Sequence, residues 1–577
     1  MIARSGLTAL MALGLTAPSL AADANAGRRL FRQECTLCHT AEADDDGGGQ
    51  GPSLAGILGR RAASNPGFGY TAALKASSLT WDAATLGHFL SSPTTVVPGT
   101  AMVVAVPNNA DRDDLIAYFQ ALRDGTLQPT KTVRMWITGG PPPTPGSSAK
   151  SETADWRNDS PGRAHQIEIG NLPAPYATAS ARNSPLVVDK PPGAQLSVPG
   201  GFKVSVFSRD VLAPRAMRLA PNGDIFLTET NTGRVKVLRP SADGTTAASV
   251  EVFAKGLNLP FGMAFYPSGA NPQWLYVAES TRIVRYAYTV GQQHAMALPE
   301  VVVPQLYPNP GTDHVTRDLA LSADGTRLFV SVGSSSNVAE RMPMKSAKDI
   351  AAWEAGHGLG AAWGPETNRA DVLAFEVDPG TGKLSAAKIF ATGLRNCAGL
   401  TVQPATGKLW CTVNERDGLG DDLVPDYSTR VNEGTFFGWP WYYLGSHEDP
   451  RKRGDRPDLK GKVTVPDVPY QAHSAPLNMV FYSATTGAAA FPREYAGDGF
   501  VALHGSWNRS LRTGYKIVRV RMKNGAPSGE YDDFLVGFIA SNSAVWGRPV
   551  GLVVAADGSL LFSDDGNNLI YRISYSH

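Results

Sequence analysis

Between residues 201 and 577, short runs of alternating apolar and polar residues are separated by turn residues. In the clearest copies, Asn-Gly or Asp-Gly follows one apolar run and leads into the next, beginning at Ala220, Ser322 and Ala556. Alternation with period two predicts half-buried strands, and Asn-Gly or Asp-Gly between two such runs predicts a hairpin. Looser copies cover 265–279, 402–413 and 481–504.

About six such repeats predict a six-bladed β-propeller, because one sheet with that many strands would curl or split. The region allows roughly 60 residues per blade, more than the ~40–50 of compact propeller repeats. We therefore expect long loops on one face of the propeller. Loops on a rigid scaffold commonly carry a functional site.

Residues 22–125 follow a helical pattern instead. The predicted helices cover 24–33, 81–90 and 110–122, and the last of them places Leu115, Phe119 and Leu122 on one stripe. The chain is therefore predicted to be multidomain, with an all-α domain followed by an all-β propeller.

Residues 126–200 are rich in proline, as at 141–143 and 191–192, and show little periodicity. This composition is typical of a linker, parts of which pack on its neighbours. Residues 1–21 combine an apolar run with the small-residue sequence Ser19-Leu20-Ala21 and predict a signal peptide for a periplasmic protein. A membrane anchor is the alternative, although Pro18 interrupts the short apolar run, and peripheral membrane association stays open.

The charges are balanced, with 53 Lys and Arg against 52 Asp and Glu. No basic patch indicates nucleic-acid binding. No polybasic run indicates binding to anionic lipid either.

The pentapeptide Cys35-Thr36-Leu37-Cys38-His39 carries the most specific chemistry. CxxCH attaches haem c covalently through two thiols, and the adjacent histidine binds the iron. A zinc half-site would need two more soft ligands nearby, but the other cysteines of the chain are Cys397 and Cys411. A thiol redox pair would need a βαβ context that this region lacks.

The second haem ligand is predicted to be Met102, and a thioether there would raise the potential of the iron. His88 is the rival ligand, and core filling is the alternative role for Met102. The segment resembles class I cytochromes c, which carry CxxCH and later motifs in this order: Gly51-Pro52-Ser53-Leu54, Gly69-Tyr70 and Pro98-Gly99-Thr100-Ala101-Met102.

Loop residues next to predicted propeller strands supply a second set of candidate groups. His314 is a candidate base, since imidazole accepts a hydroxyl proton near neutral pH. Arg395, Asn396 and Arg548 are suited to a polyanion, and the acidic loop 417–422 is suited to calcium. The alternatives are a structural histidine and a solvated turn. A propeller by itself does not define an activity.

Several motifs of the propeller together resemble the sorbosone and aldose-sugar dehydrogenases related to soluble quinoprotein glucose dehydrogenase. These are His314 with Arg317-Asp318, Gly333-Ser334-Ser335-Ser336-Asn337, Gly393-Leu394-Arg395-Asn396, Asn414-Glu415-Arg416-Asp417, Gly438-Trp439-Pro440, His504-Gly505-Ser506-Trp507-Asn508-Arg509 and Gly547-Arg548-Pro549. The resemblance implies pyrroloquinoline quinone (PQQ) above a calcium ion at the mouth of the channel.

By position, the resemblance implies His314 as the base, Arg395 as the group that polarises the quinone, and Asn396 as a cofactor contact. Arg548 would pair with a quinone carboxylate, and the carbonyls of Asp417 and Gly418 would hold calcium. The chain departs from the glucose dehydrogenases at that loop, where they carry Gly-Pro. It also departs at Trp546, where they carry Arg, and at their lysine position, for which Arg509 is the best candidate; both residues are predicted cofactor contacts.

These expectations predict a periplasmic quinohaemoprotein dehydrogenase that oxidises a sugar aldehyde or aldose at C1. Electrons would pass from PQQ to the fused haem and on to a respiratory cytochrome or quinone. The alternatives are a propeller lactonase or hydrolase, or a binding protein, with an accessory cytochrome. Cys397 and Cys411 flank a predicted hairpin and form either a disulfide or two buried thiols.

Overall fold

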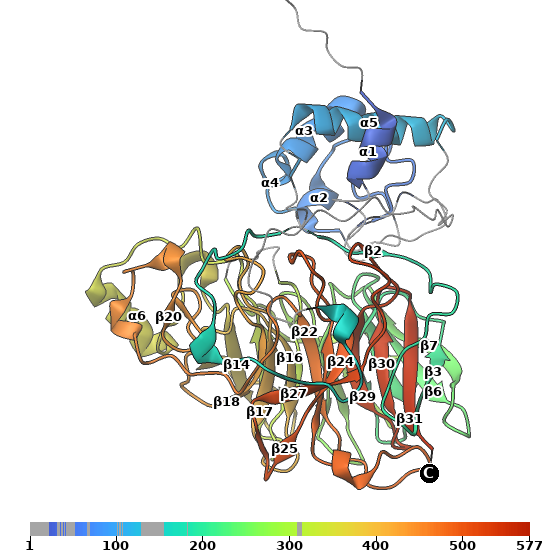
Figure 1. The fold of residues 1–577 in the computed structure, drawn as a ribbon, viewed down its shortest axis with the longest axis vertical. Helices are drawn as coiled ribbons and strands as arrows, with labels where there is room; N and C mark the ends of the chain where they lie inside the picture. Colours follow the sequence, from blue (N-terminus) through green and yellow to red (C-terminus); the bar gives the residue numbers. More distant parts are fainter. Residues whose placement is uncertain are drawn as a thin grey trace, which may run out of the picture.

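The computed structural model describes residues 22–31, 35, 39, 41, 52–65, 70–100, 102, 105–106, 108–127, 155–181, 183–308 and 314–576. Cys38, the predicted signal peptide and residues 128–154 of the proline-rich stretch lie outside these residues. The described part forms a helical domain and a β-propeller (Figure 1).

The helical domain contains α1 (Ala24–Leu30), α2 (Ala72–Ala76), α3 (Ala83–Ser91), α4 (Pro93–Val96) and α5 (Asn109–Arg123). The three predicted helices correspond to α1, α3 and α5, whereas α2 and α4 lie between the predicted helices. Asp82 and Asn108 cap α3 and α5 by accepting hydrogen bonds from backbone N–H groups. Gly27 allows α1 to lie against α5, since a Cβ at this position would meet the Asp114 carbonyl oxygen at 1.9 Å.

Six antiparallel sheets form the blades, which confirms the predicted six-bladed propeller. Blade 1 consists of β4 (Pro214–Leu219), β5 (Ile225–Glu229), β6 (Arg234–Pro240) and β7 (Ala247–Lys255). Blade 2 consists of β8 (Met263–Tyr266), β9 (Trp274–Ala278), β10 (Ile283–Ala287) and β11 (Glu300–Val303). Blade 3 consists of β12 (Leu319–Leu321), β13 (Arg327–Val332), β14 (Asp371–Glu376) and β15 (Lys388–Ala391).

Blade 4 consists of β16 (Cys397–Val402), β17 (Leu409–Val413), β18 (Tyr427–Val431) and β21 (Val468–Pro469). Blade 5 consists of β22 (Pro476–Phe481), β23 (Gly499–Leu503), β24 (Lys516–Val520) and β27 (Glu530–Leu535). Blade 6 consists of β29 (Pro549–Val554), β30 (Leu560–Asp564), β31 (Leu569–Tyr575) and β3 (Phe202–Ser208). Strand β3 pairs with β31, so the two ends of the propeller sequence share one sheet and close the ring.

The sequence repeats form the turns between the first and second strands of blades 1, 3 and 6. In blade 1 the Ala220 N–H donates to the Asp224 carbonyl oxygen at 2.8 Å, and Gly223 takes the positive φ of 89° that the turn requires. Each repeat therefore places the first strand of its blade on the propeller axis.

The first strands of all six blades surround a cavity of about 230 Å³ on this axis. Its lining includes one apolar residue from each of β4, β8, β12, β16, β22 and β29: Met217, Met263, Leu319, Leu400, Met479 and Leu552. These strands begin at one end of the channel, so residues that precede them gather there.

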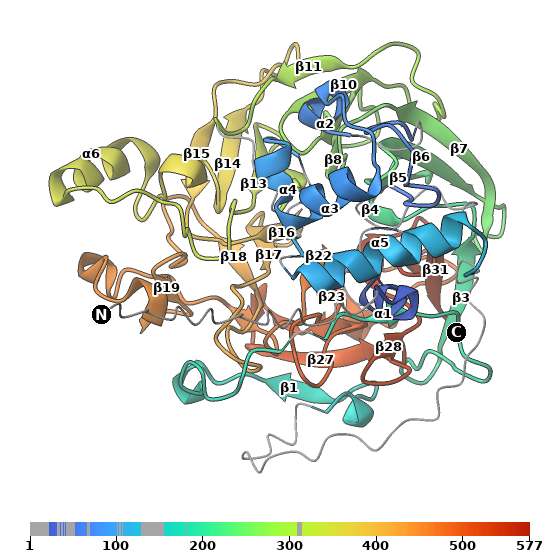
Figure 2. The same cartoon turned by 90° about the horizontal axis from the view of Figure 1, so that it is seen from above.

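Smaller elements extend from this scaffold. Helix α6 (Ala347–His357) and the hairpin of β19 (Tyr442–Tyr443) and β20 (His447–Glu448) project at one side of the propeller (Figures 1 and 2). A second hairpin joins β25 (Met522–Lys523) and β26 (Ala526–Pro527). Short 3₁₀ turns cover 156–158, 169–171, 364–366, 450–452, 457–459 and 493–495.

Residues 155–200, which were predicted to belong to the linker, are bound to the propeller. Strand β1 (Ala164–Gln166) adds a fifth strand to blade 5, and β2 (Leu186–Val187) pairs in parallel with β28 (Ala544–Val545). Parts of the predicted linker 126–200 therefore pack on the propeller, as the sequence analysis expected. Proline-rich composition lowers periodicity without preventing a segment from packing as an edge strand.

A buried ionic cluster fixes β1 to blade 5. Lys516 Nζ lies 3.0 Å from an Asp159 carboxylate oxygen and 2.7 Å from one of Asp533. His165 Nε2 lies 3.0 Å from Asp533. We call these four residues the blade-5 clasp.

Among the described helices, none is long and apolar enough to cross a membrane.

Candidate functional site at the channel mouth

The predicted propeller residues gather at the end of the channel where the first strands begin. His314 precedes β12, Arg395 and Asn396 precede β16, and Arg548 precedes β29. Figure 1 shows the C-terminus, which follows β31, at the end of the propeller far from the helical domain. Since β29 and β31 run in the same direction, the site lies at the end that faces the helical domain.

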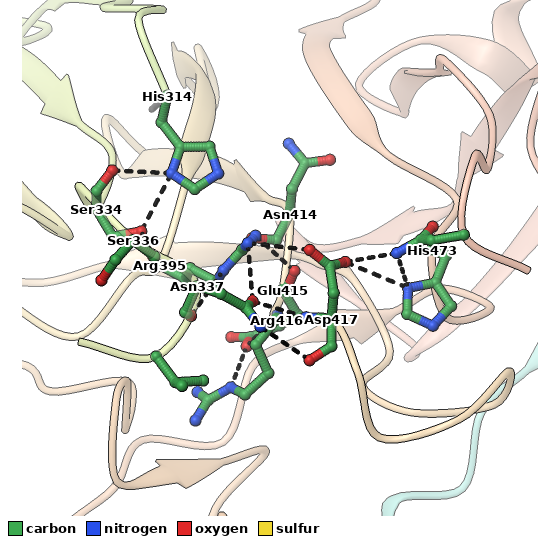
Figure 3. A network of polar contacts seen from close by, with 12 residues as sticks. His314, Ser334, Ser336, Asn337, Arg395, Asn414, Glu415, Arg416, Asp417 and His473 are labelled. Atoms are coloured by element: carbon green, nitrogen blue, oxygen red, sulfur yellow. Dashed lines mark hydrogen bonds and ion pairs between the residues drawn. The ribbon is translucent and has the colours of Figure 1, made fainter. Parts of the chain in front are cut away.

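His314 is held by the backbone of the next loop. Its Nδ1 lies 2.9 Å from the Ser334 carbonyl oxygen, which only accepts, so Nδ1 carries the proton and Nε2 keeps its lone pair. Figure 3 shows Nε2 on the side of the ring where Arg395 and Asn414 lie. Burial, and secondly the charge of Arg395, hold the pKa of His314 well below its usual value of 6.5.

Gly333 lets His314 and Asn396 approach one another. A Cβ at Gly333 would lie 2.5 Å from Asn396 Oδ1 and 2.6 Å from the Cβ of His314. Any larger residue at Gly333 would therefore displace two predicted site residues. The glycine of the Gly333-Ser334-Ser335-Ser336-Asn337 motif has a steric role in the site.

Arg395 is the centre of a polar network that joins three loops (Figure 3). Its Nη2 donates to Asn337 Oδ1 at 3.1 Å and to Asp417 Oδ2 at 3.2 Å, and its Nη1 donates to the Glu415 carbonyl oxygen at 2.7 Å. Asn508 Nδ2 donates to the other carboxylate oxygen of Asp417 and contacts His473 Nδ1 at 3.0 Å. The guanidinium of Arg395 is therefore fixed next to His314.

Two buried amide oxygens of the site, Asn396 Oδ1 and Asn414 Oδ1, have no hydrogen-bond partner among the described residues. Buried polar atoms are usually satisfied, so such atoms at a channel mouth fit a bound polar ligand. Their position next to Arg395 favours a ligand that has both hydrogen-bonding groups and negative charge.

A second cationic group lies across blades 5, 6 and 1. Arg548 Nη2 contacts His504 Nδ1 at 3.0 Å, His504 Nε2 contacts Asp565 Oδ1 at 2.8 Å, and Arg215 Nη1 contacts Asp565 Oδ2 at 2.5 Å. Burial and the charge of Arg548 lower the pKa of His504 to about 4, so this histidine is neutral at pH 7. The group keeps a net positive charge that suits a carboxylate ligand, as predicted for Arg548.

Two predicted cofactor contacts are instead parts of the scaffold. Arg509 donates through Nη2 to Asp422 Oδ1 at 2.6 Å and through Nη1 to the Asp421 carbonyl oxygen, and thereby holds the site loop. Trp546 is 1% exposed, packs in the core beneath Lys190, and donates its indole N–H to the Gly537 carbonyl oxygen at 2.8 Å. Both side chains therefore have partners inside the scaffold, and their contact with a cofactor stays a prediction.

The hydrogen bonds of the Asp417 carbonyl oxygen do not fit its predicted role as a calcium ligand. This oxygen accepts hydrogen bonds from Asn337 Nδ2 at 3.0 Å and from Arg451 Nη1 at 2.7 Å. A carbonyl oxygen has two lone pairs, and both are used here, one of them by a guanidinium. A calcium ion on this carbonyl would have to displace one of these donors.

The haem residues of the helical domain fit their predicted roles. His39 Nδ1 lies 2.7 Å from the Pro52 carbonyl oxygen, which leaves Nε2 available for iron. Burial lowers the pKa of His39, and a neutral imidazole is the form that binds metal. Cys35 and Met102 both pack against the core of this domain, while Cys38 lies outside the described residues.

The pattern analysis did not find Arg215, Arg451, His473 or Asp565. Arg215 lies in β4, Arg451 in the 450–452 turn, and His473 and Asp565 in loops. Each contacts a side chain or carbonyl oxygen from another strand or loop. A signal existed only for Asp565, which directly follows the last repeated turn and strand.

The fold and the site together define a class: a six-bladed propeller with a cationic, histidine-containing channel mouth, joined to a haem-binding helical domain. The Glucose / Sorbosone dehydrogenase family model matches residues 211–526, and the Cytochrome c model matches residues 24–123. The chain therefore belongs to the glucose/sorbosone dehydrogenase family and carries a cytochrome c domain at its N-terminal side. This family consists of oxidoreductases of the glucose and sorbosone dehydrogenase type.

Individual proteins agree with this assignment. Cytochrome c2 of Rhodomicrobium vannielii is 45% identical over 103 residues, which cover 17% of this chain and 78% of that protein. The PQQ domain of pyranose dehydrogenase from Coprinopsis cinerea, in its holo form, has the same fold, with a TM-score of 0.52 and 20% identity over 68% of this chain and 99% of that chain. A Trichoderma reesei protein of Carbohydrate-Active Enzymes Family AA12 gives a TM-score of 0.53 at 19% identity over 68% of this chain and 100% of that chain.

Proposed function

We propose that this chain is a PQQ-dependent dehydrogenase that oxidises an aldose or a sorbosone-like sugar aldehyde at C1. When bound, PQQ supplies a two-electron acceptor for the sugar, and haem c supplies a one-electron acceptor for onward transfer. The final acceptor is a cytochrome or quinone of the respiratory chain.

The observation that carries this proposal is the pairing of His314 with Arg395. The Nδ1–H of His314 is bound by the Ser334 carbonyl oxygen, and its Nε2 lone pair is free to accept a proton. The low pKa of His314 keeps the imidazole neutral at physiological pH. His314 therefore removes the proton of the C1 hydroxyl while the C1 hydrogen leaves as hydride.

Arg395 stabilises negative charge that develops beside His314. Its guanidinium is fixed by Asn337, Asp417 and Glu415, so it does not reorganise during the reaction. The unpaired amide oxygens of Asn396 and Asn414 can accept hydrogen bonds from the polar edge of PQQ. The guanidinium of Arg548 can pair with a PQQ carboxylate.

The arrangement of the domains supports direct electron transfer from the propeller to haem. The channel mouth and the helical domain are on the same side of the propeller (Figures 1 and 2). A covalent connection keeps the haem at high effective concentration near the site without a tight binding interface.

We also propose a periplasmic location. The predicted signal peptide supports it, and so does the disulfide between Cys397 and Cys411 in blade 4. Disulfides persist in oxidising compartments, and haem attachment through CxxCH belongs to the same compartments.

The test is reconstitution of the full-length haem protein with PQQ, followed by a panel of aldoses and sugar aldehydes with a small dye as acceptor. We expect PQQ binding and sugar-dependent dye reduction. Absence of PQQ binding under every ionic condition would contradict the proposal. Hydrolysis of a sugar lactone without dye reduction would instead indicate the lactonase alternative.

A further inference from the structure

Arg451 lies at the point where the family resemblance implies calcium, and four interactions fix its side chain and backbone. Its Nη2 and Nε bind the two carboxylate oxygens of Asp449 at 2.7 and 2.9 Å, and its backbone N–H donates to the same carboxylate at 2.9 Å. Its Nη1 donates to the Asp417 carbonyl oxygen at 2.7 Å. Bidentate pairing of this kind gives a guanidinium one defined position.

Asp449 is itself held in place. Its side chain is completely buried and lies 3.4 Å from Nη1 of the fully buried Arg416. Arg416 also donates to the carbonyl oxygens of Pro440 at 2.9 Å and Tyr442 at 2.7 Å. The position of Arg451 is therefore set by the core and does not depend on a flexible surface contact.

Gly418 provides the space that Arg451 needs. It has a φ of +90°, and a Cβ there would lie 3.2 Å from Arg451 Nη1. The dipeptide Asp417-Gly418, which differs from the Gly-Pro of the glucose dehydrogenases, therefore leaves room for the Arg451 guanidinium against the loop. A proline at position 418 could not adopt this positive φ.

Other oxygen atoms of the same loop are also engaged. Ser510 binds both carboxylate oxygens of Asp421, and Arg509 binds Asp422 and the carbonyl oxygen of Asp421. Elsewhere in the described part of the chain, one group of three potential metal-binding side chains occurs, in the blade-5 clasp. There the Lys516 ammonium lies between the carboxylates.

Arg451 is connected directly to the catalytic pair. Asp417, whose carbonyl oxygen it binds, also carries the carboxylate that pairs with Arg395 at 3.2 Å. A guanidinium stays charged at any physiological pH, but the Asp449 carboxylate that Arg451 binds offsets this charge, so Arg451 acts on Arg395 through Asp417.

We propose that Arg451 replaces calcium as the fixed cation of the cofactor site, so that PQQ binding and sugar oxidation by this chain do not require calcium. This inference rests on the proposed function, because it concerns the site that PQQ would occupy. Arg451 positions the 417–422 loop by occupying the Asp417 carbonyl oxygen at the end of the site where a polyanionic quinone would bind.

The experiment titrates PQQ into full-length haem protein that has been freed of metal with a chelator, and compares chelator with added calcium. PQQ binding is followed by its absorbance and by quenching of tryptophan fluorescence, and thermal unfolding is recorded in parallel. We expect the dissociation constant for PQQ to agree within about twofold in the two conditions. We also expect added calcium to leave the melting temperature unchanged, since an ion that binds the native state would raise it.

Variants separate the charge of Arg451 from its hydrogen bond. Arg451→Ala removes both and frees the Asp417 carbonyl oxygen, so PQQ affinity in chelator should fall at least tenfold and calcium should restore part of it. Arg451→Gln keeps a donor but loses the charge, and should also weaken PQQ binding. Arg453→Ala, at an exposed position two residues away, is the matched control and should behave like the unmodified chain.

The outcomes distinguish this inference from the proposed function. If the unmodified chain binds PQQ only with calcium, the role of Arg451 is refuted while the dehydrogenase proposal stands. If Arg451→Ala binds PQQ without calcium as tightly as the unmodified chain does, the role of Arg451 is refuted as well. If PQQ binds in neither condition, the proposed function itself fails. Circular dichroism of each variant checks that a loss of binding does not come from unfolding.

Discussion

At the residue scale, the account depends on His314 as a buried, neutral base. Burial and the nearby charge of Arg395 lower the pKa of the ring and so disfavour its protonation, while the Ser334 carbonyl oxygen fixes the tautomer. Both effects act on the atom Nε2 that would meet the sugar. Perturbation of this kind in a cleft is typical of a functional histidine.

Replacement of His314 by Gln should lower kcat by about 10²–10⁴-fold, the usual contribution of a general base. PQQ binding should persist, because glutamine occupies a similar volume and leaves Arg395 in place. Steady-state kinetics with a dye acceptor and a PQQ titration together check this expectation. Unchanged kcat would remove His314 from the mechanism.

The low pKa of His314 also predicts the pH profile. In the folded protein the imidazole stays neutral below pH 6.5, whereas the unfolded chain takes up a proton there. Activity should therefore be retained on going from pH 7 to pH 6, because Nε2 still accepts a proton. A rate profile that loses half its activity near pH 6.5 would contradict this environment for His314.

The same linkage predicts that the stability of the folded protein decreases as the pH is lowered. His504 has a pKa of about 4 in the folded state, and its unfolded value is about 6.5, so the stabilisation is present above pH 6.5. It is lost progressively as the pH falls from about 6.5 to 4. Thermal unfolding measured across this range should show the decrease, and a melting temperature that rises over it would contradict the expectation.

At the element scale, blade 4 carries the site on a cross-linked hairpin. Cys397 directly follows Asn396, and its disulfide to Cys411 joins β16 to β17, with a Cα–Cα distance of 5.7 Å. The disulfide alternative of the sequence analysis is therefore confirmed. Because the crosslink lies next to Arg395 and Asn396, it also restrains the start of the strand that presents them.

Replacing both Cys397 and Cys411 by Ala should lower the free energy of unfolding of the propeller by about 2–4 kcal/mol. The loss comes mainly from the larger conformational freedom of the unfolded chain. Denaturant unfolding of the unmodified and double-variant proteins, both under oxidising conditions, measures it. A loss below about 0.5 kcal/mol would show that the crosslink contributes little.

The blade-5 clasp makes a second prediction at this scale. Although burial opposes it, Asp159 and Asp533 raise the pKa of Lys516, which is therefore charged. Lys516→Met would leave the fully buried Asp533 with His165 as its remaining partner in the clasp. Breaking a buried ion pair in this way typically costs about 3–5 kcal/mol.

Calorimetry of the propeller transition tests the clasp. The exposed Lys523→Met, in the same blade, is the control and should change stability by less than about 0.5 kcal/mol. Equal melting temperatures for the two variants would contradict an ionic role for Lys516. Release of β1 from blade 5 would also expose residues 155–166 to proteolysis.

At the scale of the whole molecule, patterns that repeat were predictable and contacts between loops were not. The turns at Ala220, Ser322 and Ala556 recur, so the propeller follows from hairpin chemistry alone. The haem motif is equally local, since Cys35 and His39 lie within one turn. His314, Arg395 and Asn396 lie directly before the first strands of blades 3 and 4, so the architecture brings them together.

The contacts that the sequence did not reveal share one physical cause. The side chains of Arg509 and Trp546 and the carbonyl oxygen of Asp417 bind other loops, through Asp422, Gly537 and Arg451. The place where the linker packs was hidden for the same reason, because Lys516 and Asp533 lie more than 300 residues from β1. Pairing partners that far apart leave no periodic signal in the sequence.

The central claim is that sugar oxidation at the propeller reduces the haem of the same chain. The most direct measurement is the absorption spectrum of the full-length haem protein, loaded with PQQ under anaerobic conditions, after addition of an aldose or sugar aldehyde. The reduced-haem band should appear with the unmodified chain and should form far more slowly with His314→Gln. If no aldose or sugar aldehyde produces the band in the PQQ-loaded protein, the account is contradicted.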